Sequence, residues 1–297
     1  MLLTHPDVQA FLDYLRFEKR YSQHTLVSYQ TDLEQFFYFL QGRYSDTNVQ
    51  GITASFVRSW LAELKGLDNS SKTINRKIST LKSFFRYLMK QGVIKQTPMT
   101  TIISPKASKR LPAFVEEKST DTLFKHVEFT DDWKGRTGRL ILSLFYHTGM
   151  RLNELITLKE HHIDAHYRQI KVLGKGNKER IIPVSKELLN ELQAYVTEKP
   201  VKLEGINVVF VNEKGKALYP KYVYNTVKGY LTLVTTLEKR SPHILRHTFA
   251  THLMNNGAEL NAVKELLGHS SLAATQVYTH NTIEKLKDIH KKAHPKA

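Results

Sequence analysis

The sequence predicts a mainly α-helical protein of two domains: an N-terminal four-helix domain, and a mostly helical C-terminal domain with a small β-sheet or hairpin. Three observations support this fold class. The chain has 297 residues, which is enough for two modest domains. Apolar residues recur at helical spacing through most of its length. Two β-type segments flank a turn rich in glycine, which is typical of a hairpin.

Residues 1 to about 92 predict four helices, each with an apolar stripe at helical spacing. Capping residues and glycines mark the predicted ends: Thr4 with Pro6 for the first helix, Ser22 and Gly42 for the second, Thr53 and Gly66 for the third, and Ser70 or Ser71 for the start of the fourth.

The fourth helix has a polar face that suits phosphates and a DNA groove. Lys72, Arg76 and Arg86 lie away from the side of the helix that faces a core. The core-facing apolar residues are Ile74, Ile78, Leu81, Phe85 and Leu88. A merely solvated face is the alternative for this helix considered alone.

A linker is predicted where helical periodicity stops, between Gly92 and Phe114. This stretch contains three prolines and a basic cluster of Lys106, Lys109 and Arg110. We therefore predict an N-terminal helical domain over residues 1–97, a linker over 98–112 and a C-terminal domain over 113–297. A basic linker would let two basic domains close around a duplex.

The C-terminal part predicts a sheet segment among helices. RQIKVL and KERIIPV form the hairpin around the turn of residues 174–177, and HHIDAH is interpreted as a polar loop before it. Helices are predicted at 119–127, 137–147, 185–197, 220–235, 243–256, 259–267 and 271–280.

Charge indicates a polyanionic partner. Lysine and arginine number 44 against 28 acidic residues, a formal net charge of +16. The first 104 residues carry 13 basic and 8 acidic side chains and the remainder 31 and 20, so both parts are basic. The absence of cysteine excludes disulfides, thiolate metal sites and cysteine nucleophiles. The N-terminus lacks the pattern of a signal peptide and the longest apolar run is too short to span a bilayer, so we expect a cytoplasmic protein.

Residues 242–280 contain a dense set of basic and imidazole groups. His243 and Arg246 are one helical turn apart and can converge on one anion. His269 follows Gly268 at a helix break, where backbone amides are free to meet a phosphate. Tyr278 lies near enough to reach the same place.

These residue types suit metal-free phosphoryl transfer. A tyrosine phenol has a pKa of about 10 and needs a base, for which His243 is the candidate. Arg151 and Arg246 can stabilise charge on the phosphate oxygens, and Lys175 in the hairpin turn can protonate a leaving alkoxide. The alternatives are a structural Tyr278, a zinc site among the histidines and a plain basic turn at Lys175. The HExxH motif is absent, which argues against a zinc site. The GK[ST] sequence is absent as well, which argues against a nucleotide-binding loop.

The motifs TGMRLNEL, GKGNKER, HILRH, LGHSS and VYTH, in this order, resemble the tyrosine recombinase (phage integrase) family and within it the Xer-type recombinases. The resemblance extends nearly end to end. It implies that residues 1–97 are a core-binding domain and that residues 113–297 are a catalytic domain with a C-terminal docking tail. It implies that Arg151 and Arg246 clamp the phosphate, Lys175 is the general acid and His243 the general base. It further implies that His269 binds phosphate, Tyr278 is the nucleophile and Glu154 supports the site.

The resemblance also implies how such an enzyme works. The family forms a 3′-phosphotyrosyl bond without metal, ATP or other cofactor, and acts as a tetramer on two double-stranded DNA sites. The predicted role is resolution of chromosome dimers at cell division, alone or with a paralogous recombinase, and possible activation by a DNA translocase is left open. A mobile-element integrase, a type IB topoisomerase and a non-catalytic DNA-binding relative are the alternatives.

Overall fold

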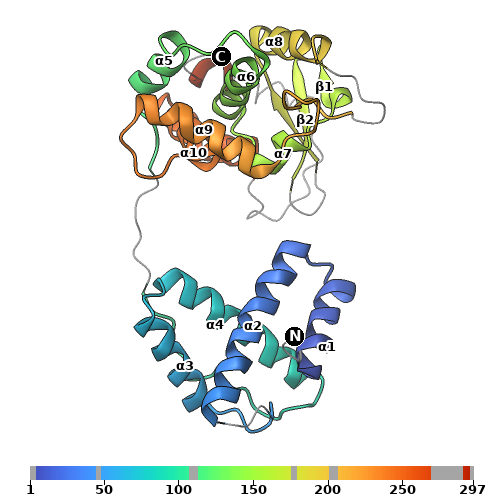
Figure 1. Ribbon diagram of the computed structural model, residues 1–297, viewed down its shortest axis with the longest axis vertical. Coiled ribbons are helices and arrows are strands. Elements are labelled where there is room, and N and C mark those ends of the chain that lie inside the picture. Colours follow the sequence, from blue (N-terminus) through green and yellow to red (C-terminus); the bar gives the residue numbers. More distant parts are fainter. Residues whose placement is uncertain are drawn as a thin grey trace. The chain divides into compact units, whose positions relative to one another are not determined.

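The chain forms two compact units, Met1–Arg110 and Leu111–Ala297. The structure is a computed structural model that describes residues 5–44, 48–106, 113–174, 179–200, 207–268 and 290–294. Figure 1 shows helices in both units and a small sheet in the second. The mainly helical fold class is therefore confirmed.

The N-terminal unit contains the four expected helices. Ser70 caps the last of them, because its Oγ accepts a hydrogen bond from Thr73 N at 3.2 Å. Thr4 lies outside the described residues, and His5 caps the first helix, with Pro6 in its opening turn. The elements are α1 (Pro6–Asp13), continued by a π-helical turn (Tyr14–Glu18), α2 (Gln23–Tyr44), α3 (Ala54–Gly66) and α4 (Ser71–Lys90).

The predicted end of α2 at Gly42 was wrong, since the helix continues to Tyr44. A glycine within a helix costs only about 1 kcal/mol relative to alanine, so it does not by itself end one. The two further residues are stabilised by packing, because the ring of Tyr44 stacks on Phe56 of α3 at a centroid distance of 4.1 Å.

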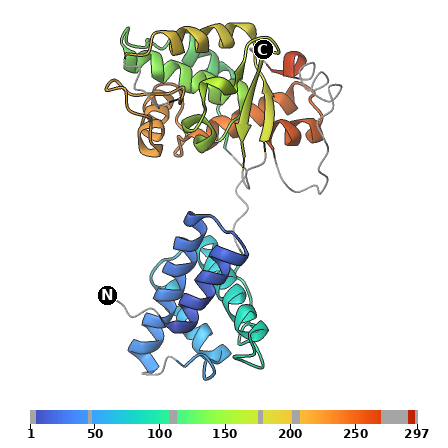
Figure 2. The same cartoon turned by 90° about the vertical axis from the view of Figure 1, so that its right-hand side faces the viewer.

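Part of the stretch assigned to the linker packs into the N-terminal core. Met99 and Ile102 are buried there. Pro105 O accepts a hydrogen bond from Asn75 Nδ2 at 2.9 Å, which ties the chain to α4. Figure 2 shows the four helices of this unit packed side by side. Because of the hydrogen bond from Asn75, the chain is attached to this bundle at least as far as Pro105.

The C-terminal unit places a three-stranded antiparallel sheet among helices. The strand order is β1-β2-β3, and the register pairs Ile170 with Ile163 on one side and with Ile182 on the other. The elements are α5 (Glu117–Lys125), α6 (Trp133–Thr148), α7 (Leu152–Ile156), a 3-10 turn (Glu160–His162), β1 (Ile163–Asp164), β2 (Gln169–Leu173), β3 (Glu179–Pro183), α8 (Lys186–Thr197), α9 (Pro220–Val234), α10 (Pro242–Asn255) and α11 (Leu260–Leu267).

The predicted hairpin and six of the seven helices predicted in this part are confirmed to within a few residues, while the helix predicted at 271–280 lies outside the described residues. The interpretation of HHIDAH as a loop was wrong for its first four residues. His161 and His162 complete the 3-10 turn and Ile163 begins β1, because the pairing with β2 orders the segment. His166 lies in the turn that follows β1.

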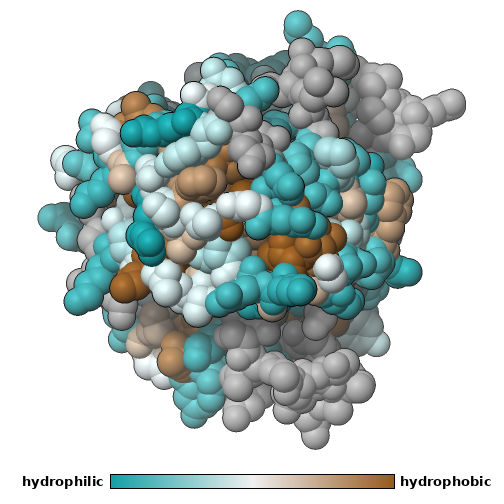
Figure 3. Space-filling view, turned by 90° about the horizontal axis from the view of Figure 1, so that it is seen from below, coloured by the Kyte–Doolittle hydropathy of each residue, from teal (hydrophilic) through white to brown (hydrophobic). Residues whose placement is uncertain are grey.

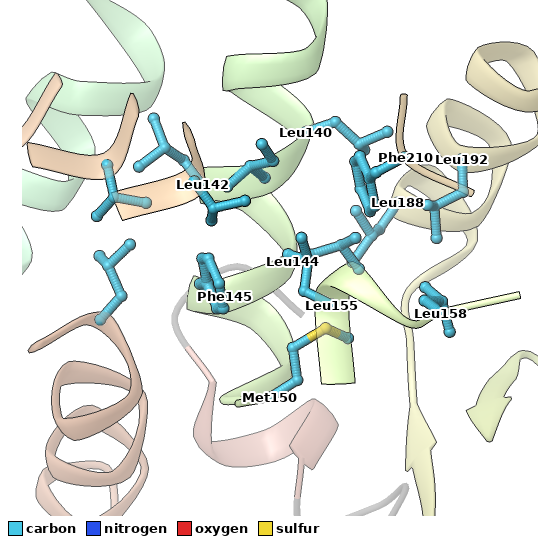
Figure 4. Close-up of a cluster of buried hydrophobic side chains, with 14 of the residues drawn as sticks. Leu140, Leu142, Leu144, Phe145, Met150, Leu155, Leu158, Leu188, Leu192 and Phe210 are labelled. Atoms are coloured by element: carbon cyan, nitrogen blue, oxygen red, sulfur yellow. The ribbon is translucent and has the colours of Figure 1, made fainter. Parts of the chain in front are cut away.

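The core of this unit is built around α6. Leu140, Leu144 and Phe145 of this helix are fully or almost fully buried. Figure 4 shows Leu144 toward Leu155 of α7 and Leu140 toward Leu188 of α8, with Phe145 on the other side of α6. Exposed large hydrophobic residues, by contrast, are scattered, and the face in Figure 3 is mostly hydrophilic with small separate apolar patches. Among the described residues no helix is both long and apolar enough to cross a bilayer.

Candidate active site

The junction between α6 and α7 positions the first candidate residues. Gly149 ends α6 in the left-handed conformation, with a φ of 57°. Arg151 then caps α7, and its backbone N–H donates to Glu154 Oε2 at 2.6 Å. The turn therefore brings the predicted phosphate-binding arginine and the predicted supporting acid together within four residues.

Glu154 is a buried carboxylate shared by two arginines. Arg151 Nη1 donates to Oε1 at 2.9 Å. Arg180 of β3 donates from both terminal nitrogens, from Nη1 to Oε1 and from Nη2 to Oε2 at 2.8 Å. Burial alone would raise the pKa of Glu154, but the hydrogen bonds and charge of Arg180, helped by Arg151, bring that pKa below its ordinary value. Glu154 is therefore ionised at neutral pH.

Arg246 of α10 is buried beside this pair. Its Nη1 donates to Gly149 O at 2.6 Å and its Nη2 to Leu267 O at 2.7 Å. Burial, together with the positive charges of Arg151 and Arg180, lowers its pKa to about 9. At neutral pH it thus remains charged in a site that already contains two other guanidiniums.

All three arginines also contact the turn at the end of α11. Arg151 Nη2 donates to Gly268 O at 3.0 Å and Arg180 Nε to Leu266 O at 3.1 Å. Arg246 Nη2 donates to the carbonyl between these two, that of Leu267. This turn immediately precedes position 269. The structure thus gathers α7, β3, α10 and the end of α11 around one cluster of positive charge.

The remaining predicted catalytic residues are placed less fully. His243 is exposed in the first turn of α10, one turn before the buried Arg246. Lys175, His269 and Tyr278 lie outside the described residues. Within the described part of the chain, no cluster of three or more histidine or acidic side chains could bind a metal ion.

Arg180 was missed in the sequence, although a signal was present. In ERIIP the strand alternation places Arg180 on the same buried face as Ile182. A charged residue at an inward position of a strand is rarely tolerated without a partner. Such a position therefore indicates a buried ion pair, but the sequence does not name the partner.

The predicted DNA-contacting residues that the structure describes, Lys72, Arg76, Arg86 and Lys106, are all exposed. Lys109 and Arg110 lie outside the described residues.

Arg76 is fixed by the buried Asp32 of α2, with which it forms an ion pair, and it donates to Ser28 Oγ at 2.9 Å. Asp32 also accepts from the buried Lys77 Nζ at 2.9 Å and from Thr80 Oγ1 at 2.9 Å. An acid in the core therefore orders one cation of the exposed face of α4.

Comparison with known proteins matches both units. The "Phage integrase family" model matches residues 113–285 and the "Phage integrase, N-terminal SAM-like domain" model residues 8–92. The tyrosine recombinase XerC of Staphylococcus saprophyticus is 40% identical over 97% of this chain and 97% of its own. That of Chlorobaculum parvum is 35% identical over 98% of this chain and 94% of its own.

Solved structures are similar as well. The XerH site-specific recombinase bound to difH substrate, a pre-cleavage complex, is 26% identical with a TM-score of 0.69, over 94% of this chain and 82% of that one. Its post-cleavage complex with palindromic difH has a TM-score of 0.73 at 23% identity, over 95% and 82% of the two chains.

Proposed function

Because the chain belongs to the phage integrase family and is a site-specific tyrosine recombinase, we propose that its arginine cluster binds the scissile phosphate of a DNA recombination site. Arg151 and Arg246 are the two phosphate ligands in this proposal. The observation that carries it is the charge of the described cluster. Three guanidiniums share the cluster with one carboxylate, which two of them contact, and this leaves an excess of two positive charges at a largely buried place.

An anion is the natural partner of such a cluster. Buried charges are unfavourable unless they are paired, and guanidiniums match the geometry of phosphate oxygens. A phosphodiester that develops further negative charge during nucleophilic attack would be stabilised most in the transition state. The cluster therefore suits catalysis as well as binding.

The remaining roles in the proposed reaction fall to four residues. The phenolic oxygen of Tyr278 attacks phosphorus while His243 accepts its proton, and the bond from phosphorus to the 5′ oxygen breaks. Lys175 protonates that oxygen, and His269 binds the phosphate beside the arginines. The products are a 3′-phosphotyrosyl enzyme and a free 5′-hydroxyl, so the energy of the phosphodiester bond is conserved for rejoining.

At the level of the cell, we propose resolution of chromosome dimers at division, in the cytoplasm. The similarity to XerC recombinases over nearly the whole chain supports this role above that of a mobile-element integrase. The proposed partners are double-stranded DNA and further recombinase protomers, as a tetramer of this chain or with a paralogue. A DNA translocase is a further candidate activator.

The test is covalent capture. Wild-type and Tyr278→Phe proteins are incubated with a nicked suicide duplex that carries a candidate chromosomal recombination site, and a gel shift verifies binding. A denaturant-resistant protein–DNA adduct is expected with wild type alone. Binding without an adduct from either protein would contradict the proposed chemistry and favour a non-catalytic DNA-binding protein.

A further inference from the structure

Arg180 is a buried arginine to which the proposed reaction gives no task. All three nitrogens of its guanidinium donate to protein acceptors: Nη1 and Nη2 to the two oxygens of Glu154, and Nε to Leu266 O. This side chain is therefore oriented by the protein before any DNA arrives.

Glu154 is divided unequally between its two arginines. Arg180 engages both carboxylate oxygens in a fork, the strongest geometry for such a pair. The side chain of Arg151 reaches only Oε1, through Nη1, and its Nη2 turns to Gly268 O. The negative charge of Glu154 is thus compensated chiefly by Arg180.

We infer that Arg180 is a positioning residue: it occupies Glu154 in a fork, so that this carboxylate orients Arg151 without neutralising it. The positive charge of Arg151 then remains available for a phosphate. Without Arg180, Glu154 would be left with Arg151 as its cationic partner, would close a fork with it and would compete with the phosphate. This inference rests on the proposed active site.

The close packing at Gly268 supports a fixed place for Arg180. Gly268 has a φ of 64°, and a Cβ added there would lie 2.8 Å from Arg180 Cδ. The stem of Arg180 therefore lies directly against the turn that ends α11. Its guanidinium connects this turn to Glu154, and through Glu154 to Arg151.

The experiment compares Arg180→Met, Glu154→Gln and the double variant. Methionine keeps much of the apolar stem of arginine and removes the charge. The measurements are the first-order rate of adduct formation on the nicked suicide duplex, duplex affinity by gel shift, and folding by circular dichroism. Arg180→Met is expected to slow the adduct roughly 100-fold, the usual effect of losing one electrostatic contribution to a transition state.

The decisive result is a change of sign. Glu154→Gln is expected to slow cleavage in the wild-type background, because it removes the acid that orients Arg151. In the Arg180→Met background it is expected to accelerate cleavage roughly tenfold, since it frees Arg151 from the carboxylate. If Glu154→Gln does not accelerate cleavage in the Arg180→Met background, the inference is overturned.

Arg136 and Glu198 provide the matched control, because they form an ion pair in the same unit with both side chains about half exposed. Arg136→Met and Glu198→Gln are expected to leave the cleavage rate within roughly twofold, alone or together. Should Arg180→Met fail to fold, Arg180→Lys replaces it: this variant keeps the charge, loses the fork and is expected to cleave more slowly. A wild-type rate for Arg180→Lys overturns the inference.

The wild-type protein separates the two proposals. If it forms no adduct, the proposed active site fails and this inference fails with it. If it forms the adduct and the double variant cleaves no faster than Arg180→Met, this inference alone is overturned.

Discussion

Replacing Gly149 with alanine is expected to destabilise the C-terminal unit by about 2–5 kcal/mol. Two costs contribute. The φ of 57° is a left-handed conformation, which costs an L residue about 1–2 kcal/mol. The new Cβ would lie 2.4 Å from Phe249 Cδ1 and 2.9 Å from Leu267 Cδ2. Phe249 is fully buried and cannot easily move, so overpacking adds about 1–3 kcal/mol.

Two other glycines separate these costs. Gly257 has a φ of 86°, but an added Cβ would meet no described atom within 4 Å, so Gly257→Ala should show the backbone cost alone. Gly229 lies inside α9, also with open space around it. Gly229→Ala is therefore expected to stabilise the protein by about 0.5–1 kcal/mol, because alanine favours the helix.

Urea unfolding followed by tryptophan fluorescence measures these differences. The chain has two tryptophans, Trp60 in the N-terminal unit and Trp133 in the C-terminal unit. A Trp60→Phe background therefore leaves Trp133 as the reporter, where its ring stacks on Tyr195 at a centroid distance of 4.3 Å. If Gly149→Ala destabilises no more than Gly257→Ala, the steric part of the reasoning is refuted.

Three further predictions follow from buried charges and imidazoles. Asp32→Ala leaves Lys77 buried without its carboxylate and is expected to cost the N-terminal unit about 3–5 kcal/mol, measured through Trp60 fluorescence. Burial, with help from neighbouring histidines, lowers the pKa of His294 from 6.5 to about 2. Between these two pKa values, His294 is therefore protonated in the unfolded chain and neutral in the folded chain. The free energy of unfolding should decrease as the pH is lowered below about 6.5, by up to about 1.4 kcal/mol per pH unit. His294→Gln should make this dependence on pH less steep in urea titrations from pH 5 to 8. Arg246→Ala is expected to reduce adduct formation by about 10²–10³-fold with a much smaller change in gel-shift affinity, and an equal loss of both would place its role in binding alone.

Local signals predicted most of the fold because helix ends depend on nearby residues. Ser70 caps α4 through a hydrogen bond to an amide three residues away, and Gly149 and Gly268 end helices through their own φ angles. α7 was missed since five residues are too few to show a helical period. The helix end was wrongly predicted at Gly42 because Tyr44 packs on Phe56 of another helix, a contact that local sequence does not reveal.

The site could be predicted only as far as residue types identify a chemistry. Arg151 and Arg246 stood out because they occur in recognisable motifs. The contacts that hold these arginines in place could not be predicted, because the partners are far apart in the sequence. Arg180 and Glu154 are 26 residues apart, and Arg246 and Gly149 are 97 apart. The same limit concealed Asp32, whose partners Lys77 and Thr80 lie on another helix. Pairings of this kind are set by the tertiary fold.

The acceptors that fix the arginines explain how the cluster can be both rigid and charged. Arg246 is oriented by two backbone carbonyls, of Gly149 and Leu267, and Arg151 by Gly268 O beside one oxygen of Glu154. A carbonyl accepts a hydrogen bond without adding a net charge, whereas a carboxylate for each arginine would cancel the cluster's positive potential. Carbonyl anchoring therefore pre-orients the guanidiniums and preserves their charge for an incoming phosphate. The carbonyls of Leu267 and Gly268 belong to the turn at the end of α11, as does that of Leu266, which accepts from Arg180. Any substitution that displaces this turn should therefore also misalign the phosphate site.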